Sequence, residues 1–215
     1  MLNLDVSSIL AIIAAISTFY FGIRSIRSDK KNRALEKEKI TLEWDDLETV
    51  AKDLFLRIRK DTKNNYKPDM IFIPDIKDGT ICHMIKSQLS IELPIIPIMT
   101  GISVWRDTLG VDSGIIGCYE PFYDMVQTSN WFVFIPKGIT DYKNKKILIV
   151  DDIALTGETC KGLKEWFLGK GFDKDNIKYA CITSTKHALE SGHPPDYHWK
   201  EIDTFDFYFP WGKGR

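Results

Sequence analysis

The sequence lacks the features that mark several common classes of protein. Cysteine is scarce: the four cysteines form no CxxC pair and have no spacing typical of a metal site. They predict reduced thiols in a cytosolic domain and exclude a disulfide framework. No sign of charge predominates, because the formal net charge is −1 over 215 residues, so composition favours neither nucleic acid nor an acidic surface as a partner. Internal repeats and low-complexity tracts are missing too.

The chain does contain enough apolar material for a substantial core. Hydrophobic residues make up 44% of it, and six of its residues are tryptophan. Its length suits one domain with an appendage better than two full domains.

The N-terminal segment differs from the rest. Residues 6–23, VSSILAIIAAISTFYFGI, carry no charge, and as a helix they would extend roughly 27 Å, close to the ~30 Å hydrocarbon thickness of a bilayer. The aromatic triplet at 19–21 lies where an interfacial belt would be. Residues 24–39 follow with seven basic and three acidic side chains, and residues 1–5 hold no Lys or Arg.

Three interpretations of this segment were weighed. A cleaved signal peptide would need positive charge in front and a small-residue cleavage site behind, and neither is present. A buried core helix would normally show a polar face, whereas this run is apolar nearly all round. We therefore expect a transmembrane helix at 6–23, an extracytoplasmic N-terminus at 1–5, a charged helical stalk at 24–39, and a single-pass cell-membrane protein whose remaining residues are cytoplasmic.

Downstream of residue 39, helical and extended patterns alternate. Apolar spacing predicts a helix within 41–61, and further helices are expected at 81–89 and 161–168. Strand candidates are 70–74, 93–99, 130–136, 145–150 and 178–184. Residues 101–130 show no clear period and predict a mobile loop or an irregular hairpin. The alternation predicts an α/β domain with a mostly parallel sheet flanked by helices.

The stretch 147–160, ILIVDDIALTGETC, is the most informative part of the sequence. A buried strand delivers Asp151 and Asp152 to the sheet edge where ligands of open α/β sheets bind. The next residues open a helix whose free N–H groups favour a phosphate, with Thr156 and Thr159 adding hydroxyls and Gly157 allowing close approach. The acids suit sugar hydroxyls or a shared Mg²⁺, so the pattern predicts a site for a phosphorylated sugar. An ordinary strand-to-helix turn with a capping Asp is the simpler alternative.

The motif VDDIALTGET resembles the PRPP-binding motif of type I phosphoribosyltransferases, which transfer ribose 5-phosphate from 5-phosphoribosyl 1-pyrophosphate (PRPP) to a nitrogenous base. The resemblance extends over residues 40–211. The segment 40–73 is similar to the first helix and strand of the xanthine/guanine/hypoxanthine branch, and 195–211 resembles its C-terminal strand and Pro-Trp ending. It implies the type I phosphoribosyltransferase fold for a domain at 40–215, with a small C-terminal hood, and a homodimer.

The resemblance also implies roles for individual residues. Asp151 and Asp152 would hold the ribose hydroxyls together with Mg²⁺ and serve in catalysis. The 5-phosphate would be bound by the turn formed by Leu155, Thr156, Gly157, Glu158 and Thr159. Pyrophosphate would lie at Lys77, Asp78 and Gly79, and Phe205 or Phe207 would stack on the base.

Several positions depart from the family pattern. Leu155 stands where purine-using members carry an Asp near N7 of the base, and it can do no proton chemistry. Asp78 replaces the first Gly of the pyrophosphate loop, where a carboxylate repels a diphosphate unless it reaches Mg²⁺ or points away. Lys77 replaces an Arg and loses bidentate phosphate contacts. The stacking aromatic falls on Asp206, so that Phe205 or Phe207 could stack only if the strand is shifted by one residue.

Two functional hypotheses follow from these observations. The first is a membrane-anchored enzyme that transfers ribose 5-phosphate to a purine-like base and releases pyrophosphate. Arg106 is either an exposed loop residue or a group that neutralises transition-state charge in it. The second is a sensor or effector module that binds PRPP or a nucleotide without transfer.

Overall fold

The fold is described from a computed structural model. It covers residues 40–62, 66–89, 96–106, 119, 121–203 and 206–214. Residues 41–215 form one compact unit. The first described strand is β1 (Ile40–Thr41).

The localisation predicted from the sequence is contradicted by the structure. None of the helices within the described ranges is both long enough and apolar enough to cross a bilayer. The predicted span at 6–23 and the predicted stalk at 24–39 lie outside the described residues.

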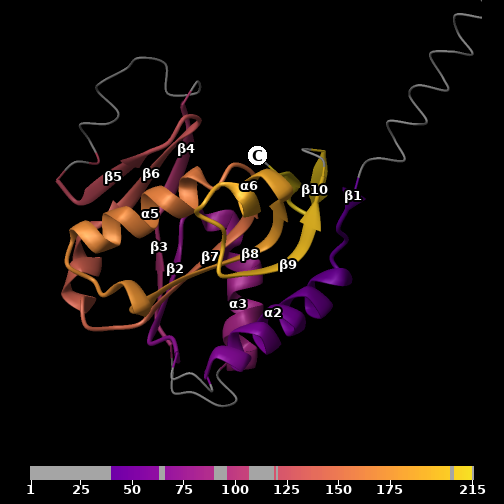
Figure 1. Ribbon diagram of the computed structural model, residues 1–215, viewed down its shortest axis with the longest axis horizontal. Helices are drawn as coiled ribbons and strands as arrows, with labels where there is room; N and C mark the ends of the chain where they lie inside the picture. Colours follow the sequence, from indigo (N-terminus) through magenta and orange to yellow (C-terminus); the bar gives the residue numbers. More distant parts are fainter. Residues whose placement is uncertain are drawn as a thin grey trace, which may run out of the picture. The chain divides into compact units, whose positions relative to one another are not determined.

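A five-stranded sheet forms the centre of the domain (Figure 1). Its strands are β3 (Ile98–Thr100), β2 (Met70–Ile73), β7 (Ile147–Ala154), β8 (Ile177–Thr185) and β9 (Tyr197–Ile202), in that order. Each neighbouring pair is parallel. The α/β fold with a parallel central sheet is therefore confirmed. Strand β7 lies in the middle, so whatever it carries at its C-terminal end lies between the ends of two other strands.

Helices cover both faces of this sheet (Figure 1). Helices α2 (Asp46–Thr62) and α3 (Gly79–Leu89) contact each other and the sheet on one side, and α5 (Glu158–Gly169) covers the other. A short helix, α6 (Lys186–Glu190), follows β8. The predicted periodicity of α2 is correct, since its apolar stripe is buried. Segments of 3₁₀-helix lie at η1 (Ile76–Asp78), η3 (Lys137–Tyr142) and η4 (Lys174–Asn176).

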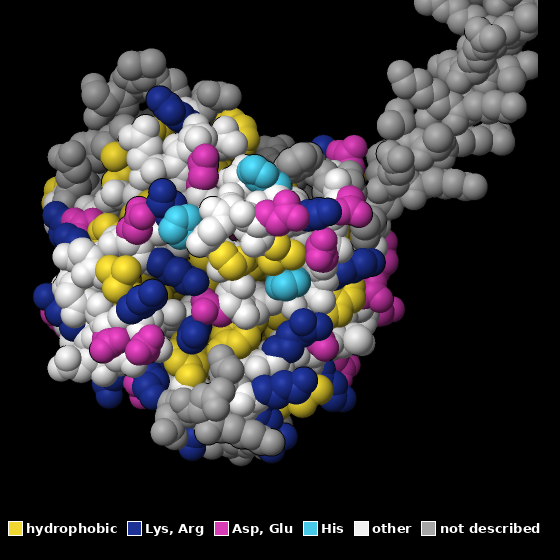
Figure 2. Space-filling model, viewed as in Figure 1, with side chains coloured by type: hydrophobic (Ala, Val, Ile, Leu, Met, Phe, Trp, Pro, Cys, Tyr) yellow, Lys and Arg dark blue, Asp and Glu magenta, His cyan; other side chains and the backbone are white. Residues whose placement is uncertain are grey.

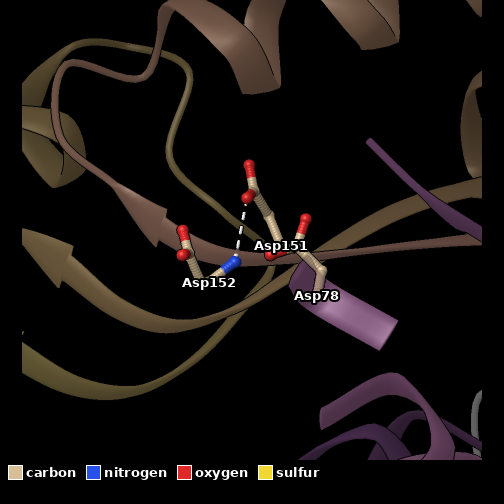
Figure 3. A group of neighbouring side chains, drawn as sticks. All are labelled: Asp78, Asp151 and Asp152. Atoms are coloured by element: carbon tan, nitrogen blue, oxygen red, sulfur yellow. Dashed lines mark hydrogen bonds between the residues drawn. The ribbon is translucent and has the colours of Figure 1, made fainter. Parts of the chain in front are cut away.

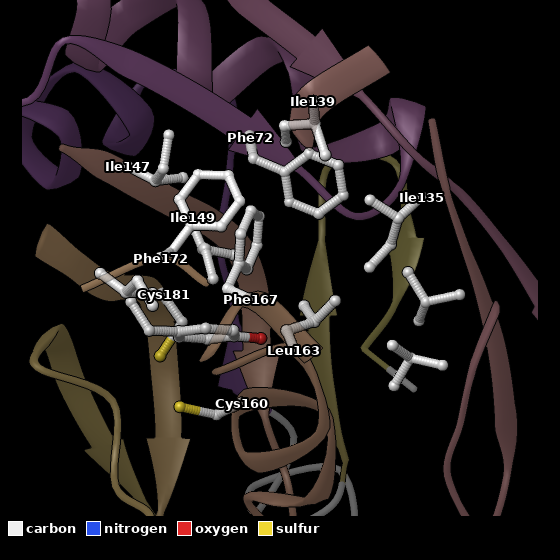
Figure 4. Close-up of a cluster of buried hydrophobic side chains, with 14 of the residues drawn as sticks. Phe72, Ile135, Ile139, Ile147, Ile149, Cys160, Leu163, Phe167, Phe172 and Cys181 are labelled. Carbon is white, nitrogen blue, oxygen red and sulfur yellow. The ribbon is translucent and has the colours of Figure 1, made fainter. Parts of the chain in front are cut away.

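The core beneath α5 is built by strand alternation. Phe72, Ile149 and Cys181 point to one face because successive strand residues point to opposite faces. They pack against Leu163 and Phe167 of α5 (Figure 4), and Phe167 meets Phe72 edge-on at a centroid distance of 5.8 Å. This packing fixes α5, and therefore the turn at its N-terminus, against β7.

A second, antiparallel sheet occupies part of the region without a clear sequence period. Its order is β4 (Ile102–Trp105), β6 (Trp131–Pro136) and β5 (Tyr123–Gln127). Val126 of β5 joins the core beneath α5. The two flanking strands are largely half-exposed, so their side chains carry little of the alternation by which a strand is recognised.

The C-terminal hairpin consists of β10 (Phe207–Phe209) and β11 (Gly212–Lys213), paired antiparallel with Tyr208 opposite Lys213. It belongs to a three-stranded sheet of order β1-β10-β11. The face drawn in Figure 2 intersperses basic and acidic side chains, as expected from a net charge near zero.

Candidate functional site

Two adjoining cavities lie at the C-terminal end of β7. The first has a volume of about 280 Å³ and the second about 310 Å³. Trp131, Ile153, Thr159 and Lys213 line both cavities and form their common wall. The first contains the paired acids, and the second contains the turn 155–159. The structure thus brings the predicted sugar and phosphate sites together.

Asp151 and Asp152 belong to β7 itself, because pairing with β8 continues to Ala154. The Asp152 amide donates to Asp151 Oδ1 at 2.8 Å (Figure 3), and the Tyr179 hydroxyl donates to Asp151 Oδ2. The Trp211 indole N–H donates to Asp152 Oδ2 at 3.2 Å. Each carboxylate is therefore oriented by an aromatic side chain from a different element.

Asp78 completes a cluster of three carboxylates. It is only 1% exposed, and its Oδ2 accepts a hydrogen bond from the Asp75 amide at 3.2 Å. One oxygen from each of Asp78, Asp151 and Asp152 lies within 4.8 Å of the other two (Figure 3). Burial, followed by the charges of Asp151 and Asp152, raises the pKa of the Asp78 carboxyl well above its usual range.

The paired acids are perturbed in the same direction. Burial raises the pKa of Asp151 to about 6, although its hydrogen bonds from Tyr179 and Asp152 oppose the shift. Burial and the charge of Asp151 raise the pKa of Asp152 to about 7, while the hydrogen bond from Trp211 opposes it. Carboxylates that resist ionisation together are ones that a cation would stabilise.

The donor set fits Mg²⁺. Magnesium prefers hard oxygen ligands and is usually held by a few carboxylates together with substrate phosphates. Asp78, Asp151 and Asp152 supply such oxygens at the wall of the first cavity. The one Lys of the adjoining turn, Lys77, places its Nζ 3.1 Å from Asp75 Oδ2, outside this cluster.

The turn that precedes α5 is held by contacts with Thr185 and Ser191. The Thr185 hydroxyl donates to the Leu155 carbonyl oxygen at 2.5 Å. Gly157 has φ +79°, and a Cβ added there would lie 2.5 Å from Ser191 Oγ. Only glycine adopts this conformation at low cost, so the sequence requirement at 157 is both conformational and steric. Thr156 Oγ1 accepts the Glu158 amide at 3.4 Å and helps to close the turn.

Glu158 points its carboxylate away from this turn. Its two oxygens accept the Ser129 amide at 2.9 Å and the Ser129 hydroxyl at 2.8 Å. These two bonds hold the pKa of Glu158 below its usual value. Ser129 lies between β5 and β6, so Glu158 fastens that hairpin to the start of α5 and leaves its own backbone N–H to the turn.

The predicted pyrophosphate loop forms η1 and the start of α3. Asp75 caps it, accepting the Lys77 amide at 3.4 Å, and Asp78 returns the capping contact. The Lys77 ammonium lies 5.6 Å from the centroid of the Trp131 ring. Gly79 is right-handed helical with φ −56° and lines neither cavity. Lys77 and Asp78 therefore reach the first cavity, and Gly79 does not.

Phe205 and Phe207 were predicted as alternatives for stacking on a base, and Phe207 offers no surface for this. Phe207 is 0% exposed, packs against Phe209 at 4.7 Å and lines neither cavity. Phe205 lies outside the described residues. Phe207 belongs to the core because the β10 register turns it inward. Trp211 lines the first cavity, and its ring stacks parallel on Phe209 at a centroid distance of 5.1 Å.

Three residues of the site were not singled out by sequence reasoning: Tyr179, Trp131 and Lys213. Tyr179 and Trp131 resemble ordinary strand residues, and no sequence signal distinguishes them. The Pro-Trp ending was the available signal for Trp211. Arg106, considered for charge neutralisation, is exposed, lines neither cavity, and donates its amide to the Asn130 carbonyl oxygen at 2.8 Å.

Tyr179 is itself fixed by an ionic cluster. Its backbone N–H donates to Asp196 Oδ2 at 2.8 Å. The same carboxylate pairs with Lys164 of α5 at 2.8 Å and with Lys178 of β8 at 3.2 Å. Asp196 thus links α5 to β8 directly behind the residue that contacts Asp151.

Comparison with known proteins gives a domain match and a fold. Residues 120–214 match the phosphoribosyl transferase domain. No curated protein sequence matches the chain significantly.

Three solved structures illustrate the likeness in fold. A purine phosphoribosyltransferase from Pyrococcus horikoshii is 22% identical, with a TM-score of 0.54 over 83% of this chain and 97% of that one. The Helicobacter pylori xanthine-guanine-hypoxanthine phosphoribosyltransferase is 13% identical, with a TM-score of 0.55 over 80% and 93%. A Neisseria gonorrhoeae protein with bound ppGpp is 19% identical, with a TM-score of 0.54 over 80% and 89%. The chain therefore has the fold of the phosphoribosyltransferases, and its residues 120–214 match their domain family.

Proposed function

We propose that the protein transfers ribose 5-phosphate from PRPP to a purine-like nucleobase and releases pyrophosphate. One observation carries the proposal: Asp151 and Asp152 open into a cavity that shares a wall with the cavity of the turn 155–159. A sugar bearing phosphate groups at both ends matches this arrangement. The domain match at 120–214 and the phosphoribosyltransferase fold support it.

The second cavity would receive the 5-phosphate. The N-terminus of α5 directs backbone N–H groups and the positive end of its dipole at the turn 155–159. Thr156 and Thr159 line the same cavity and add hydroxyl donors. With the phosphate held there, the ribose would extend across Thr159 and Ile153 toward the paired acids.

The first cavity would receive the ribose hydroxyls and the pyrophosphate. Asp151 and Asp152 accept hydrogen bonds from the hydroxyls, and Tyr179 and Trp211 keep the two carboxylates in place. Mg²⁺ held by Asp78, Asp151 and Asp152 would supply positive charge that stabilises the departing pyrophosphate. Because the chain's contribution is orientation and charge, a displaced carboxylate should lower the rate more than it changes stability.

The acceptor is the less defined part of the proposal. The named solved structures include purine and xanthine-guanine-hypoxanthine enzymes, which supports a purine-like base. Trp211 and Trp131 offer aromatic surfaces in the first cavity. Leu155 lines the second cavity without a titratable group, so the base would lose its proton to solvent or enter already deprotonated. A homodimer is also proposed, and light scattering on the full chain tests it.

A pyrophosphate-release assay tests the transfer. Full-length protein with PRPP and Mg²⁺ should release pyrophosphate in the presence of one or more bases from a panel of purines and pyrimidines. Asp152→Asn should abolish that release, and Asp141→Asn, which alters an exposed acid in η3, should not. Undiminished release by Asp152→Asn would defeat the assignment of the paired acids.

A binding function without transfer is the second candidate. Two observations favour it: the second cavity has the apolar Leu155 in its wall, and a protein whose structure holds ppGpp has a similar fold. Calorimetry separates the two candidates. Binding of PRPP or ppGpp without pyrophosphate release from any base would support the sensor.

A further inference from the structure

Negative charge is concentrated on one side of the two-cavity site. Of the described residues that line the first cavity, four are acids and two, Lys77 and Lys213, are basic. The acids are Asp75, Asp78, Asp151 and Asp152. Of those that line the second cavity, Glu158 is the only Asp or Glu and Lys213 the only Lys or Arg. Lys213 is therefore the one Lys or Arg among the described residues that lines both cavities.

Two other charged groups near the second cavity are directed away from it. Lys77 pairs with Asp75 at 3.1 Å and lies over Trp131, on the first-cavity side of the common wall. The Glu158 carboxylate is engaged by Ser129. Lys213, on β11 of the C-terminal hairpin, contacts Asp206 Oδ1 through its Nζ, which also lies 5.8 Å from the Tyr208 ring centroid.

We propose that Lys213 is the cation that binds the phosphate of the ligand in the second cavity, and that Asp206 holds it in place until the phosphate arrives. The proposal rests on the phosphoribosyltransferase function proposed above and adds a binding residue to it. Asp206 then affects ligand binding, because its carboxylate competes with the phosphate for the ammonium group of Lys213.

The physical argument concerns charge. A phosphate at the N-terminus of α5 meets about half a positive charge from the helix dipole, whereas it carries up to two negative charges. The ammonium group of Lys213 would supply most of the remaining positive charge that the phosphate needs. The Lys213–Asp206 pair is a half-exposed ion pair, with side-chain exposures of 42% and 48%, so exchanging it for a phosphate contact costs little.

Two variants with opposite expected effects on phosphate affinity test the proposal. The ligand is ribose 5-phosphate, which has the phosphate but no pyrophosphate and can be titrated calorimetrically without Mg²⁺. Lys213→Met should weaken its binding by about tenfold or more, and Lys213→Arg should keep most of it. Asp206→Asn should tighten binding by about two- to fivefold, because it removes the negative charge that competes with the phosphate for Lys213. In the Lys213→Met background, Asp206→Asn should have no effect.

The matched control is Lys186→Met, which breaks an exposed ion pair with Glu190 (3.9 Å) on α6 and removes the same charge without touching either cavity. Equal binding by wild type and Lys213→Met, or equal losses in Lys213→Met and Lys186→Met, would overturn the role of Lys213 and leave the proposed function intact. Weaker binding by Asp206→Asn would overturn it too. If wild type binds neither ribose 5-phosphate nor PRPP with Mg²⁺, the proposed function fails and this inference fails with it.

Discussion

Trp211 donates its indole N–H to Asp152 Oδ2 at 3.2 Å, so a residue of the C-terminal hairpin orients a carboxylate at the end of the central strand. The Trp211 ring is stacked on Phe209 and meets Trp44 edge-on at 6.1 Å. The hairpin therefore does more than cover the site: it positions one of the oxygens on which metal or sugar binding would depend.

Replacing this donor should alter the acid that it contacts. Trp211→Phe keeps an aromatic ring on Phe209 but removes the hydrogen bond that holds the pKa of Asp152 down, so the pKa of Asp152 should rise further. Mn²⁺ binding, followed by electron paramagnetic resonance across a pH series, should then shift to higher pH. We expect a loss of about 1 kcal/mol in the free energy of unfolding. Trp44→Phe is the control, and an unchanged pH profile in Trp211→Phe would contradict the proposed coupling.

The metal-free protein should lose stability as pH rises. The folded state retains protons on Asp78, Asp151 and Asp152 that the unfolded chain releases above about pH 4. Since the unfolded state then binds fewer protons, the free energy of unfolding falls between about pH 4 and 7. The total loss of unfolding free energy should be a few kcal/mol at most. Each pKa unit corresponds to about 1.4 kcal/mol, and solvent screening reduces the contribution of the half-buried Asp151 and Asp152. Urea unfolding at a series of pH values measures it.

Two additions sharpen that measurement. Asp152→Asn should flatten the slope, and Asp141→Asn should leave it unchanged. Saturating MgCl₂ should stabilise the protein more at pH 7 to 8 than at pH 5, because the cation competes with protons for the same oxygens. A metal-free stability that rises over this range would show that the cluster is ionised and otherwise compensated.

Gly157 should tolerate no side chain. Gly157→Ala places a Cβ at φ +79° and against Ser191 Oγ, so we expect a loss of about 1 to 3 kcal/mol in the free energy of unfolding and weaker binding of ribose 5-phosphate. Gly169→Ala, at the end of α5 with nothing within 4 Å of the added Cβ, should be neutral or slightly stabilising. Equal stabilities of the two variants by thermal denaturation would show that the turn can relax.

The Ser129–Glu158 contact predicts a smaller effect. Ser129→Ala removes one of the two hydrogen bonds that lower the pKa of Glu158, so that pKa should rise toward its usual value in a carboxyl NMR titration. Stability should change by less than about 1 kcal/mol, because the contact is exposed. The stabilisation it does give is present above the usual Glu pKa and is lost as the pH falls. An unchanged titration would mean that Ser129 does not hold Glu158 in solution.

The sequence predicted those helices and strands whose pattern of apolar residues lies within one short stretch of chain. The amphipathic spacing of α2 and the apolar run of β7 were sufficient to predict both elements, and the latter placed Asp151 and Asp152 at the sheet edge. The strand proved longer than predicted because β8 continues to pair with it beyond the acids. That extension depends on a partner strand some thirty residues away, which no local window contains.

The misses have the same origin. Asp78 was expected beside the pyrophosphate, where it would repel a diphosphate unless it reached Mg²⁺ or pointed away, and only the packing of η1 against β7 shows that it lies with the paired acids. Phe207 was expected in a pocket because the register of β10 could not be deduced from an aromatic-rich tail, in which a shift of one residue reverses every side chain. Strands β4 and β5 depend on pairing with β6 and have weak patterns of their own.

Asp196 has a consequence for how a ligand leaves. By pairing with Lys164 and Lys178 and accepting the Tyr179 amide, it joins α5 to β8, and Tyr179 extends the link to Asp151 of β7. The Ser129–Glu158 contact fastens the β4-β6-β5 sheet to α5 as well, so we expect a ligand to leave by displacement of the C-terminal hairpin. If the hairpin closes on the reaction products, its opening sets the turnover rate of the proposed transfer, and a viscogen should slow turnover even where the chemical step is fast.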